Sequence, residues 1–332
     1  MTGQYVDPRA GRETWSVWVK AWMGRQSWAD GTVEAATTAV ESVSWVDQSI
    51  RSVKPSHVQG WVSGEIKRGL AANTVKTRLN YVQMAFRAAV SDRVIPDNPA
   101  SGVKAPRSRR QDAAMKLLSV AQSRAALDVA GDFGPFIAVC LFAGLRLGEA
   151  AGLELGDVNF LARSIRVARQ VQGSTIKTTR VVPPKYGSER TIYVPDALIE
   201  TLAAHVSDGR ITEPGETLFA NPLGQMWNRN SAGEQWRRIR TAAKLGDDVT
   251  LHALRHTFAS NLIASGCDVV TVQRALGHSQ PSITLNVYSH LWPTAEDRTR
   301  AATADFMSQV AADADSQRTG IGKPQVRGLA QR

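Results

Sequence analysis

The chain has 332 residues and a mass of 36.0 kDa, which exceeds a comfortable single core and favours two domains. Hydrophobic residues make up 43% of the sequence and charged residues 21%, a composition that excludes a largely disordered chain. The 40 basic residues exceed the 30 acidic ones by 10, which favours a polyanionic partner such as nucleic acid. A basic enzyme or a membrane-surface protein can carry the same charge.

The N-terminus is polar over residues 1–12, and the sequence contains no run of about 18 apolar residues. We therefore expect neither a signal peptide nor a membrane span, and predict a cytoplasmic protein without a membrane partner. Cys140 and Cys267 lack the Cys-x-x-Cys spacing of a zinc or redox site, so we expect two buried, reduced thiols.

The first hundred residues predict a compact helical unit. Trp15, Trp18 and Trp22 recur at i, i+3 and i+7, which places three indoles on the core-facing side of a helix over residues 14–23. Further helices are predicted over residues 32–50, 55–68 and 73–90.

A Pro- and Gly-containing stretch over residues 96–112 marks the predicted domain boundary. Four cations crowd into seven of its residues, namely Lys104, Arg107, Arg109 and Arg110. The stretch is either a solvated linker or a basic strap that crosses a nucleic-acid backbone. The predicted segments are an N-terminal segment 1–12, a helical domain 13–99, a linker 100–112, a second domain 113–312 and a disordered tail 313–332.

Beyond the linker the sequence predicts helices around a small antiparallel sheet. Alternating or β-branched residues indicate three strands, over residues 164–171, 180–182 and 190–194. Helices are predicted over residues 113–130, 135–142, 231–245, 251–264, 268–276, 282–290 and 295–312. The predicted fold class is therefore mainly α with a small antiparallel β-sheet, in two domains.

A glycine-flanked turn, Gly144-Leu-Arg-Leu-Gly-Glu149, places Arg146 and Glu149 on one face at the start of a helix. Free amides at the helix start and a guanidinium group suit a phosphate, with the carboxylate orienting the arginine. A surface ion pair is the alternative interpretation.

A second motif lies on the predicted helix at residues 251–258, where His252 and Arg255 fall side by side at the border of an apolar face. His252 and His256 have the i, i+4 spacing of two zinc ligands. Ala253, however, occupies the position where the zinc-protease motif requires Glu. We therefore expect no metal site.

A third motif places His278 directly after the glycine that ends a helix, with Tyr288 ten residues later. Taken singly, each is more typical of packing than of catalysis. Together with the first two motifs, the chain resembles the tyrosine recombinase family, which includes the phage integrases and chromosome-resolving enzymes. The matching blocks are Gly144-Leu-Arg-Leu-Gly-Glu, His252-Ala-Leu-Arg255-His-Thr, Leu276-Gly-His278-Ser and Tyr288-Ser-His290-Leu.

The resemblance implies a site with six catalytic residues and one supporting residue. By position these are the arginines Arg146 and Arg255, the second-block His252, the third-block His278, the nucleophile Tyr288, a lysine and the supporting Glu149. The lysine of the family lies in a β-hairpin turn, and Lys185 within Pro183-Pro-Lys-Tyr-Gly-Ser-Glu-Arg-Thr191 fits that place. Lys177 is close enough to compete for the assignment.

The resemblance implies a site-specific recombinase, most simply a phage or prophage integrase, that forms a 3′-phosphotyrosyl intermediate and exchanges strands through a four-way junction. In this mechanism His252 takes the proton of the tyrosine. Neither a cofactor nor a metal is implied. The implied partners are double-stranded DNA attachment sites, a homotetramer on two duplexes, and an accessory directionality factor or host DNA-bending protein at the nucleoid.

Two alternatives remain open: a DNA binder with an inactive site, and a DNA-relaxing enzyme like the type IB topoisomerases. The complete catalytic set disfavours the first, and the third block disfavours the second. Only about thirteen residues precede the first predicted helix, so we also expect the N-terminal arm-binding domain of many phage integrases to be absent. A truncated or alternatively started chain is the competing explanation.

Overall fold

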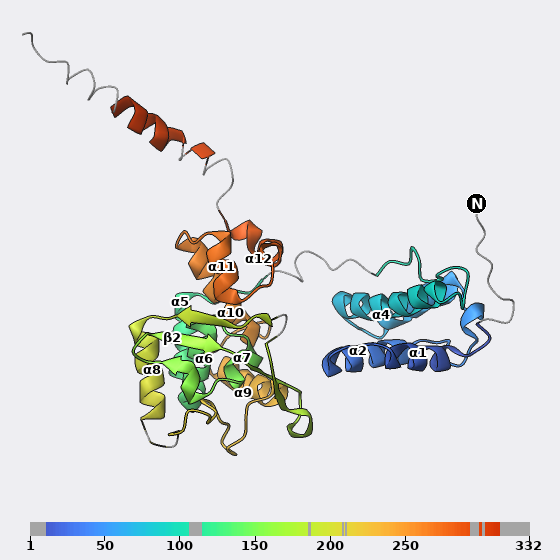
Figure 1. The fold of residues 1–332 in the computed structure, drawn as a ribbon, viewed down its shortest axis with the longest axis horizontal. Helices are drawn as coiled ribbons and strands as arrows, with labels where there is room; N and C mark the ends of the chain where they lie inside the picture. The colour runs from blue at the N-terminus through green and yellow to red at the C-terminus, as the bar shows by residue number, and fades with distance from the viewer. Residues whose placement is uncertain are drawn as a thin grey trace, which may run out of the picture. The chain divides into compact units, whose positions relative to one another are not determined.

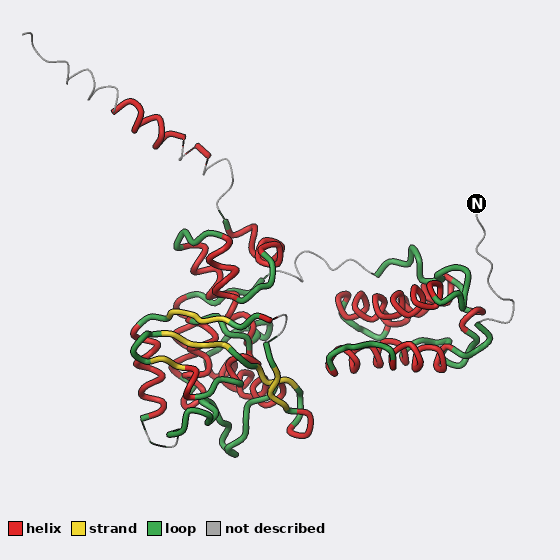
Figure 2. The backbone as a smooth tube through the Cα atoms, in the orientation of Figure 1, coloured by secondary structure: helices red, strands yellow, loops and turns green. Residues whose placement is uncertain are grey.

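The structure is a computed structural model that describes residues 11–105, 115–184, 187–207, 209, 211–292, 299–300 and 303–312. The chain forms two compact units, Met1–Ala114 and Met115–Arg332 (Figure 1). The fold is mainly helical with small antiparallel sheets, as predicted (Figure 2). The finer boundaries around the linker stay a prediction, since residues 106–114 lie outside the described ranges.

The first unit is an all-helical bundle with a tryptophan-rich core. Its elements are α1 (Trp15–Gly24), α2 (Asp30–Glu41), η1 (Ile50–Ser52), α3 (Pro55–Lys67) and α4 (Ala72–Ser91). Trp15, Trp18 and Trp22 are buried, which confirms the predicted core face. The Trp15 indole N–H donates to the Val40 carbonyl at 2.8 Å, and the Trp15 ring lies 4.5 Å from that of Phe86.

The helix predicted over residues 32–50 is wrong in its second half, because α2 ends at Glu41. Ser42 caps it, with its hydroxyl donating to the Ala39 carbonyl at 2.8 Å. The turns that follow bring the buried Trp45 ring to 6.1 Å from that of Trp15. Aromatic packing in the core therefore outweighs the helical periodicity of the segment.

The second unit surrounds small sheets with helices. Its helices are α5 (Val120–Asp128), α6 (Gly134–Phe142), α7 (Leu147–Ala151), α8 (Asp196–Val206), α9 (Arg229–Ala242), α10 (Leu251–Ala264), α11 (Val269–Leu276) and α12 (Pro281–Tyr288). Short 3-10 turns are η3 (Gly131–Phe133), η4 (Leu155–Asp157), η5 (Ile176–Thr178) and η7 (Ser289–Leu291). In Figure 1, α11 and α12 lie side by side, and α10 packs against both α6 and α11.

One helix prediction in this unit needs correction, and one helix was missed. The helix expected over residues 113–130 begins only at Val120, where Ser119 caps it. Before that cap, the Leu118 amide donates to the Thr257 hydroxyl of α10 at 2.9 Å, a contact that a helix would preclude. The helix α8 was not predicted, although its buried Leu198, Ile199 and Leu202 have helical spacing. Of the helix predicted over residues 295–312, residues 299–300 and 303–312 are described and helical.

The strands form two sheets, not the single three-stranded sheet that the sequence predicted. The antiparallel order is β1 (Val158–Asn159), β2 (Ser164–Val167) and β5 (Arg190–Tyr193), while β3 (Gln170–Gln172) pairs with β4 (Arg180–Val182). The predicted strand 164–171 thus breaks after Val167. After the break, β3 pairs with β4 instead of β5 and packs against α7, where a Cβ at Gly148 would lie 2.6 Å from the Val171 carbonyl oxygen.

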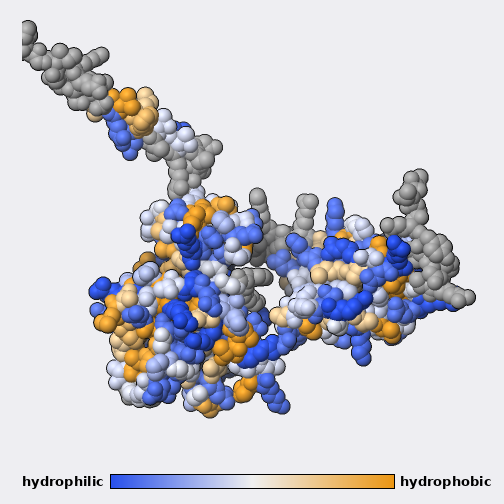
Figure 3. All heavy atoms as spheres, viewed as in Figure 1, coloured by the Kyte–Doolittle hydropathy of each residue, from blue (hydrophilic) through white to orange (hydrophobic). Residues whose placement is uncertain are grey.

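Cys140 is buried in the core as predicted, but Cys267 is only half-buried, between α10 and α11. Within the described residues, no helix combines the length and the apolar composition needed to cross a bilayer. Polar and apolar residues are interspersed over the face of each unit shown in Figure 3.

Candidate active site

The turn between α6 and α7 places Arg146 at the N-cap of α7. Gly144 has φ +66°, and a Cβ at this position would lie 2.3 Å from the Phe258 ring, so the turn requires glycine. Glu149 accepts hydrogen bonds from the Arg146 side chain at 2.5 Å and from the Arg146 backbone N–H at 2.9 Å. The predicted pair is therefore part of a helix cap that fixes the arginine.

Glu149 lies at the centre of a buried ion cluster and is 1% exposed. Arg190 of β5 donates to both of its carboxylate oxygens, at 2.8 and 3.2 Å, and Arg255 Nη1 lies 3.8 Å from Oε2. Burial alone raises the pKa of Glu149, but Arg190, Arg146 and Arg255 outweigh it and lower the pKa to about 2. Three guanidinium charges around one carboxylate leave the cluster positive.

Arg255 ties together two turns that are distant in sequence. It is 2% exposed, and its guanidinium donates to the Gly144 carbonyl at 2.6 Å and to the Leu276 carbonyl at 2.5 Å. Burial and the Arg146 charge lower the pKa of Arg255 to about 9, so it still carries its proton at neutral pH. The start of α7 and the end of α11 are thereby held beside one another.

His278 follows directly after α11, whose left-handed C-cap is Gly277 with φ +61°. The His278 Nδ1 lies 2.9 Å from the Thr284 hydroxyl of α12, which fixes the plane of the ring. Burial and the charges of Arg255, Arg146 and Arg190 lower the pKa of His278 to about 4. The imidazole is therefore neutral at neutral pH.

Tyr288 ends α12 with its ring buried and 1% exposed. Its hydroxyl lies 2.7 Å from Nδ1 of His256 on α10. Burial raises the pKa of Tyr288 to about 12, against the opposing charges of Arg255 and Arg146. The phenol is therefore protonated in this state and lies within the field of the arginines.

His252 lies one turn before His256 on α10, with the two ring centroids 4.5 Å apart in a T-shaped arrangement. Burial, His256, and the charges of Arg255 and Arg146 lower the pKa of His252 to about 4. The structure thus brings together six of the predicted residues, namely Arg146, Glu149, His252, Arg255, His278 and Tyr288.

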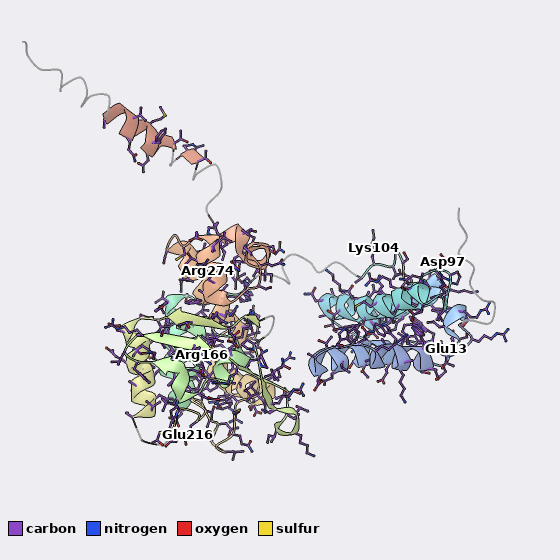
Figure 4. The ribbon with its side chains drawn as sticks, in the orientation of Figure 1. Glu13, Asp97, Lys104, Arg166, Glu216 and Arg274 are labelled. Carbon is purple, nitrogen blue, oxygen red and sulfur yellow. The ribbon has the colours of Figure 1, made fainter. Side chains whose placement is uncertain are left out.

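The predicted catalytic lysine and most of the predicted linker cations lie outside the described residues. Lys185 lies outside the described residues, and its competitor Lys177 is exposed on η5, in the loop of the β3–β4 hairpin. Lys104 is exposed on the first unit (Figure 4). The remaining linker cations, Arg107, Arg109 and Arg110, lie outside the described residues.

Sequence reasoning missed two site residues, Arg190 and His256. Arg190 shares the inward side of β5 with the buried Ile192, and an arginine at such a position needs a buried anion. That alternation was the available signal. His256 stood out only as a possible zinc ligand, and the structure directs it to Tyr288. Among the described residues there is no group of three or more His, Cys, Asp or Glu arranged to hold a metal ion.

The model of the phage integrase family matches residues 110–294, which is more than half of the chain. The chain belongs to this family of tyrosine recombinases. The recombinase is 27% identical over 287 residues to a XerC-like tyrosine recombinase of Caldanaerobacter subterraneus, covering 74% of this chain and 69% of the relative. It is 27% identical over 256 residues to the tyrosine recombinase XerD of Corynebacterium glutamicum, covering 73% and 80%. These relationships make it a site-specific recombinase.

Solved structures show the same fold. The Tn1549 transposon integrase, in complex with a circular intermediate DNA, matches with a TM-score of 0.76 at 22% identity, over 89% of this chain and 99% of that one. A lambda integrase dimer bound to a core site matches with a TM-score of 0.62 at 17% identity, over 82% and 77%.

Proposed function

We propose that this recombinase is a phage or prophage integrase that cleaves and rejoins double-stranded DNA through a 3′-phosphotyrosyl intermediate. The observation that carries the proposal is the convergence of the Tyr288 hydroxyl, which contacts His256, with the arginines around the buried Glu149. The segments that supply these groups are far apart in sequence. Packing of a tyrosine does not require such a set of cations.

The arginines and His278 bind the scissile phosphate. Arg146 and Arg255 contact its non-bridging oxygens and stabilise the negative charge that builds in the transition state, while His278 donates a hydrogen bond. Glu149 and Arg190 hold the arginines in place. Loss of one such preorganised donor typically costs about 3 to 4 kcal/mol of transition-state stabilisation.

Tyr288 Oη attacks phosphorus, a P–O bond to tyrosine forms, and the bond to the 5′ oxygen breaks. A phenol with a pKa of about 12 is a weak nucleophile, so the attack requires a proton acceptor, for which His252 and His256 are both placed beside the site. Lys185 donates the proton that the departing 5′ oxygen needs. The freed 5′ hydroxyl of a second strand then reverses the chemistry.

Lys185→Ala is expected to slow cleavage of an ordinary substrate. A 5′-thio leaving group needs little protonation, so the same variant should cleave that substrate at close to the wild-type rate. Absence of this rescue would remove the general-acid role from Lys185. The same comparison with Lys177→Ala decides between the two lysines.

The DNA partner is supported by the basic balance of the chain and by the DNA complexes of the Tn1549 and lambda integrases. Four protomers on two duplexes, with strand exchange through a four-way junction, complete the proposal, together with a directionality factor or DNA-bending protein. The test is a nicked duplex with a candidate attachment core, which traps the covalent adduct. Wild type should form the adduct and Tyr288→Phe should not. Relaxation of supercoiled DNA without recombination would favour a DNA-relaxing enzyme instead.

A further inference from the structure

The proposed reaction does not decide whether His252 or His256 accepts the proton of Tyr288. The Nδ1 atom of His256 lies 2.7 Å from the Tyr288 hydroxyl, which is hydrogen-bonding distance to the attacking atom itself. The two ring centroids are 5.6 Å apart and the planes meet at 64°, so the contact is made by the edges of the rings. His252, by contrast, lies one turn nearer the start of the same helix, and its ring meets that of His256 in a T-shaped contact with the centroids 4.5 Å apart.

We propose that His256 is the catalytic base that takes the phenolic proton from Tyr288 during strand cleavage and returns it during rejoining. The inference rests on the proposed function, because it assigns a role within the phosphotyrosyl reaction. It moves the acceptor from His252, where the family resemblance suggests it, to the neighbouring histidine.

The protonation state of His256 suits this role. Burial and the positive charge of Arg255 lower the pKa of His256, so the imidazole is neutral at neutral pH. With its proton on Nε2, the neutral ring presents the lone pair of Nδ1 to the hydroxyl, and Tyr288 donates. The groups that face the ring are His252 and Arg255 of α10 and Tyr288 of α12.

The proton and the bonds balance across the step. As Tyr288 Oη bonds to phosphorus, its proton moves to His256 Nδ1, while the bond from phosphorus to the 5′ oxygen breaks and that oxygen takes a proton from Lys185. In rejoining, the 5′ hydroxyl attacks phosphorus and returns its proton to the neutral Lys185 amine. The bond from phosphorus to Tyr288 Oη breaks, and the departing phenolate recovers its proton from the His256 imidazolium. The nearby Arg255 charge disfavours the imidazolium, which drives the proton back to the tyrosine.

The first experiment compares adduct formation on the nicked duplex by wild type, His256→Asn and His290→Asn, each as the full chain. Asparagine places a hydrogen-bonding group near the position of Nδ1 but cannot act as a base. General-base catalysis is worth about 100-fold or more, so His256→Asn should form the adduct about 100-fold more slowly. His290 is exposed just beyond Tyr288, and His290→Asn should stay within about twofold of wild type as the matched control.

The second experiment separates proton transfer from mere support of the site. A DNA strand that ends in a 3′-(4-nitrophenyl phosphate) is joined to a 5′ hydroxyl strand, and release of 4-nitrophenolate is followed by absorbance. Nitrophenolate replaces tyrosine as the leaving group and departs without a proton. The reaction is run in a Tyr288→Phe background, with and without His256→Asn, and with Arg146→Ala as the variant that damages phosphate binding.

We expect His256→Asn to leave nitrophenolate release within about threefold of its background, and Arg146→Ala to abolish it. The role of His256 as base would be overturned if His256→Asn formed the adduct at the wild-type rate. It would also be overturned if His256→Asn slowed adduct formation and nitrophenolate release by the same factor. Persistence of the adduct in Tyr288→Phe would instead overturn the proposed function, so the two failures are distinct.

Discussion

Removing the charge of Glu149 tests whether the buried ion cluster stabilises the catalytic unit. Glu149→Gln keeps the size of the side chain but leaves Arg146, Arg190 and Arg255 facing one another without their shared anion. A fall in the pKa of Glu149 from 4.5 to about 2 corresponds to about 3 kcal/mol of stability, at about 1.4 kcal/mol per pKa unit. Removal of one partner from a buried ion pair costs a similar amount, about 3 to 5 kcal/mol.

The sign follows from the lowered pKa. The ionised carboxylate stabilises the fold fully above pH 4.5, and this contribution is lost as the pH falls toward about 2. At neutral pH, therefore, Glu149→Gln should show the whole loss. Cleavage activity should fall with it, because Arg146 loses the acceptor that orients it.

Native-state hydrogen exchange, resolved by peptide mass spectrometry, measures the effect within each unit of the full chain. Amides of α6, α7 and α10 should open about 100-fold more often, which is the equivalent of about 3 kcal/mol, while those of α1–α4 should be unchanged. Glu234→Gln is the control, since Glu234 forms an exposed i,i+4 pair with Arg238, a class worth less than about 1 kcal/mol. Equal, small effects of the two substitutions would refute the reasoning.

Three further predictions concern the same site. Gly277→Ala should lower the cleavage rate at least about tenfold, because the added Cβ would lie 2.7 Å from Arg190 Nη1. Gly266→Ala is the control, since Gly266 has a similar positive φ but no atom within 4 Å of an added Cβ. Equal effects of the two substitutions in a cleavage assay would contradict the expectation. Arg190→Lys should slow cleavage about tenfold or more without loss of DNA binding, because lysine cannot make the two-point contact with Glu149. An unchanged single-turnover cleavage rate would exclude this positioning role of Arg190. The pKa values of His252 and His278 are lowered to about 4, so the neutral imidazoles contribute their full stabilisation of the fold above pH 6.5 and lose it as the pH falls toward 4. Urea titrations should therefore show the free energy of unfolding falling across that window. A flat profile would contradict the burial of neutral imidazoles.

Local patterns in the sequence were sufficient to predict most helices and to single out the motifs that carry Arg146, Glu149, His252 and Arg255. Glycine at a left-handed helix end, as at Gly277, and an arginine three residues before a glutamate, as at Arg146, are short-range signals that survive in the fold. The family resemblance then supplied the connection between distant blocks, which spacing alone does not contain.

The missed features depend on tertiary contacts. The His256 contact with Tyr288 spans 32 residues, and that of Arg190 with Glu149 spans 41. The split of the predicted strand at Val167 likewise reflects tertiary pairing, because β2 pairs with β5 whereas β3 pairs with β4 and packs against α7. Periodicity reports which side of an element faces the core, and it does not identify the partner.

The central claim is that the phenolic oxygen of Tyr288 becomes the covalent link to DNA. Wild-type protein trapped on the nicked duplex can be digested with nuclease and trypsin, and the peptide that retains a nucleotide sequenced by mass spectrometry. We expect the nucleotide on Tyr288. A nucleotide on any other residue would contradict the claim.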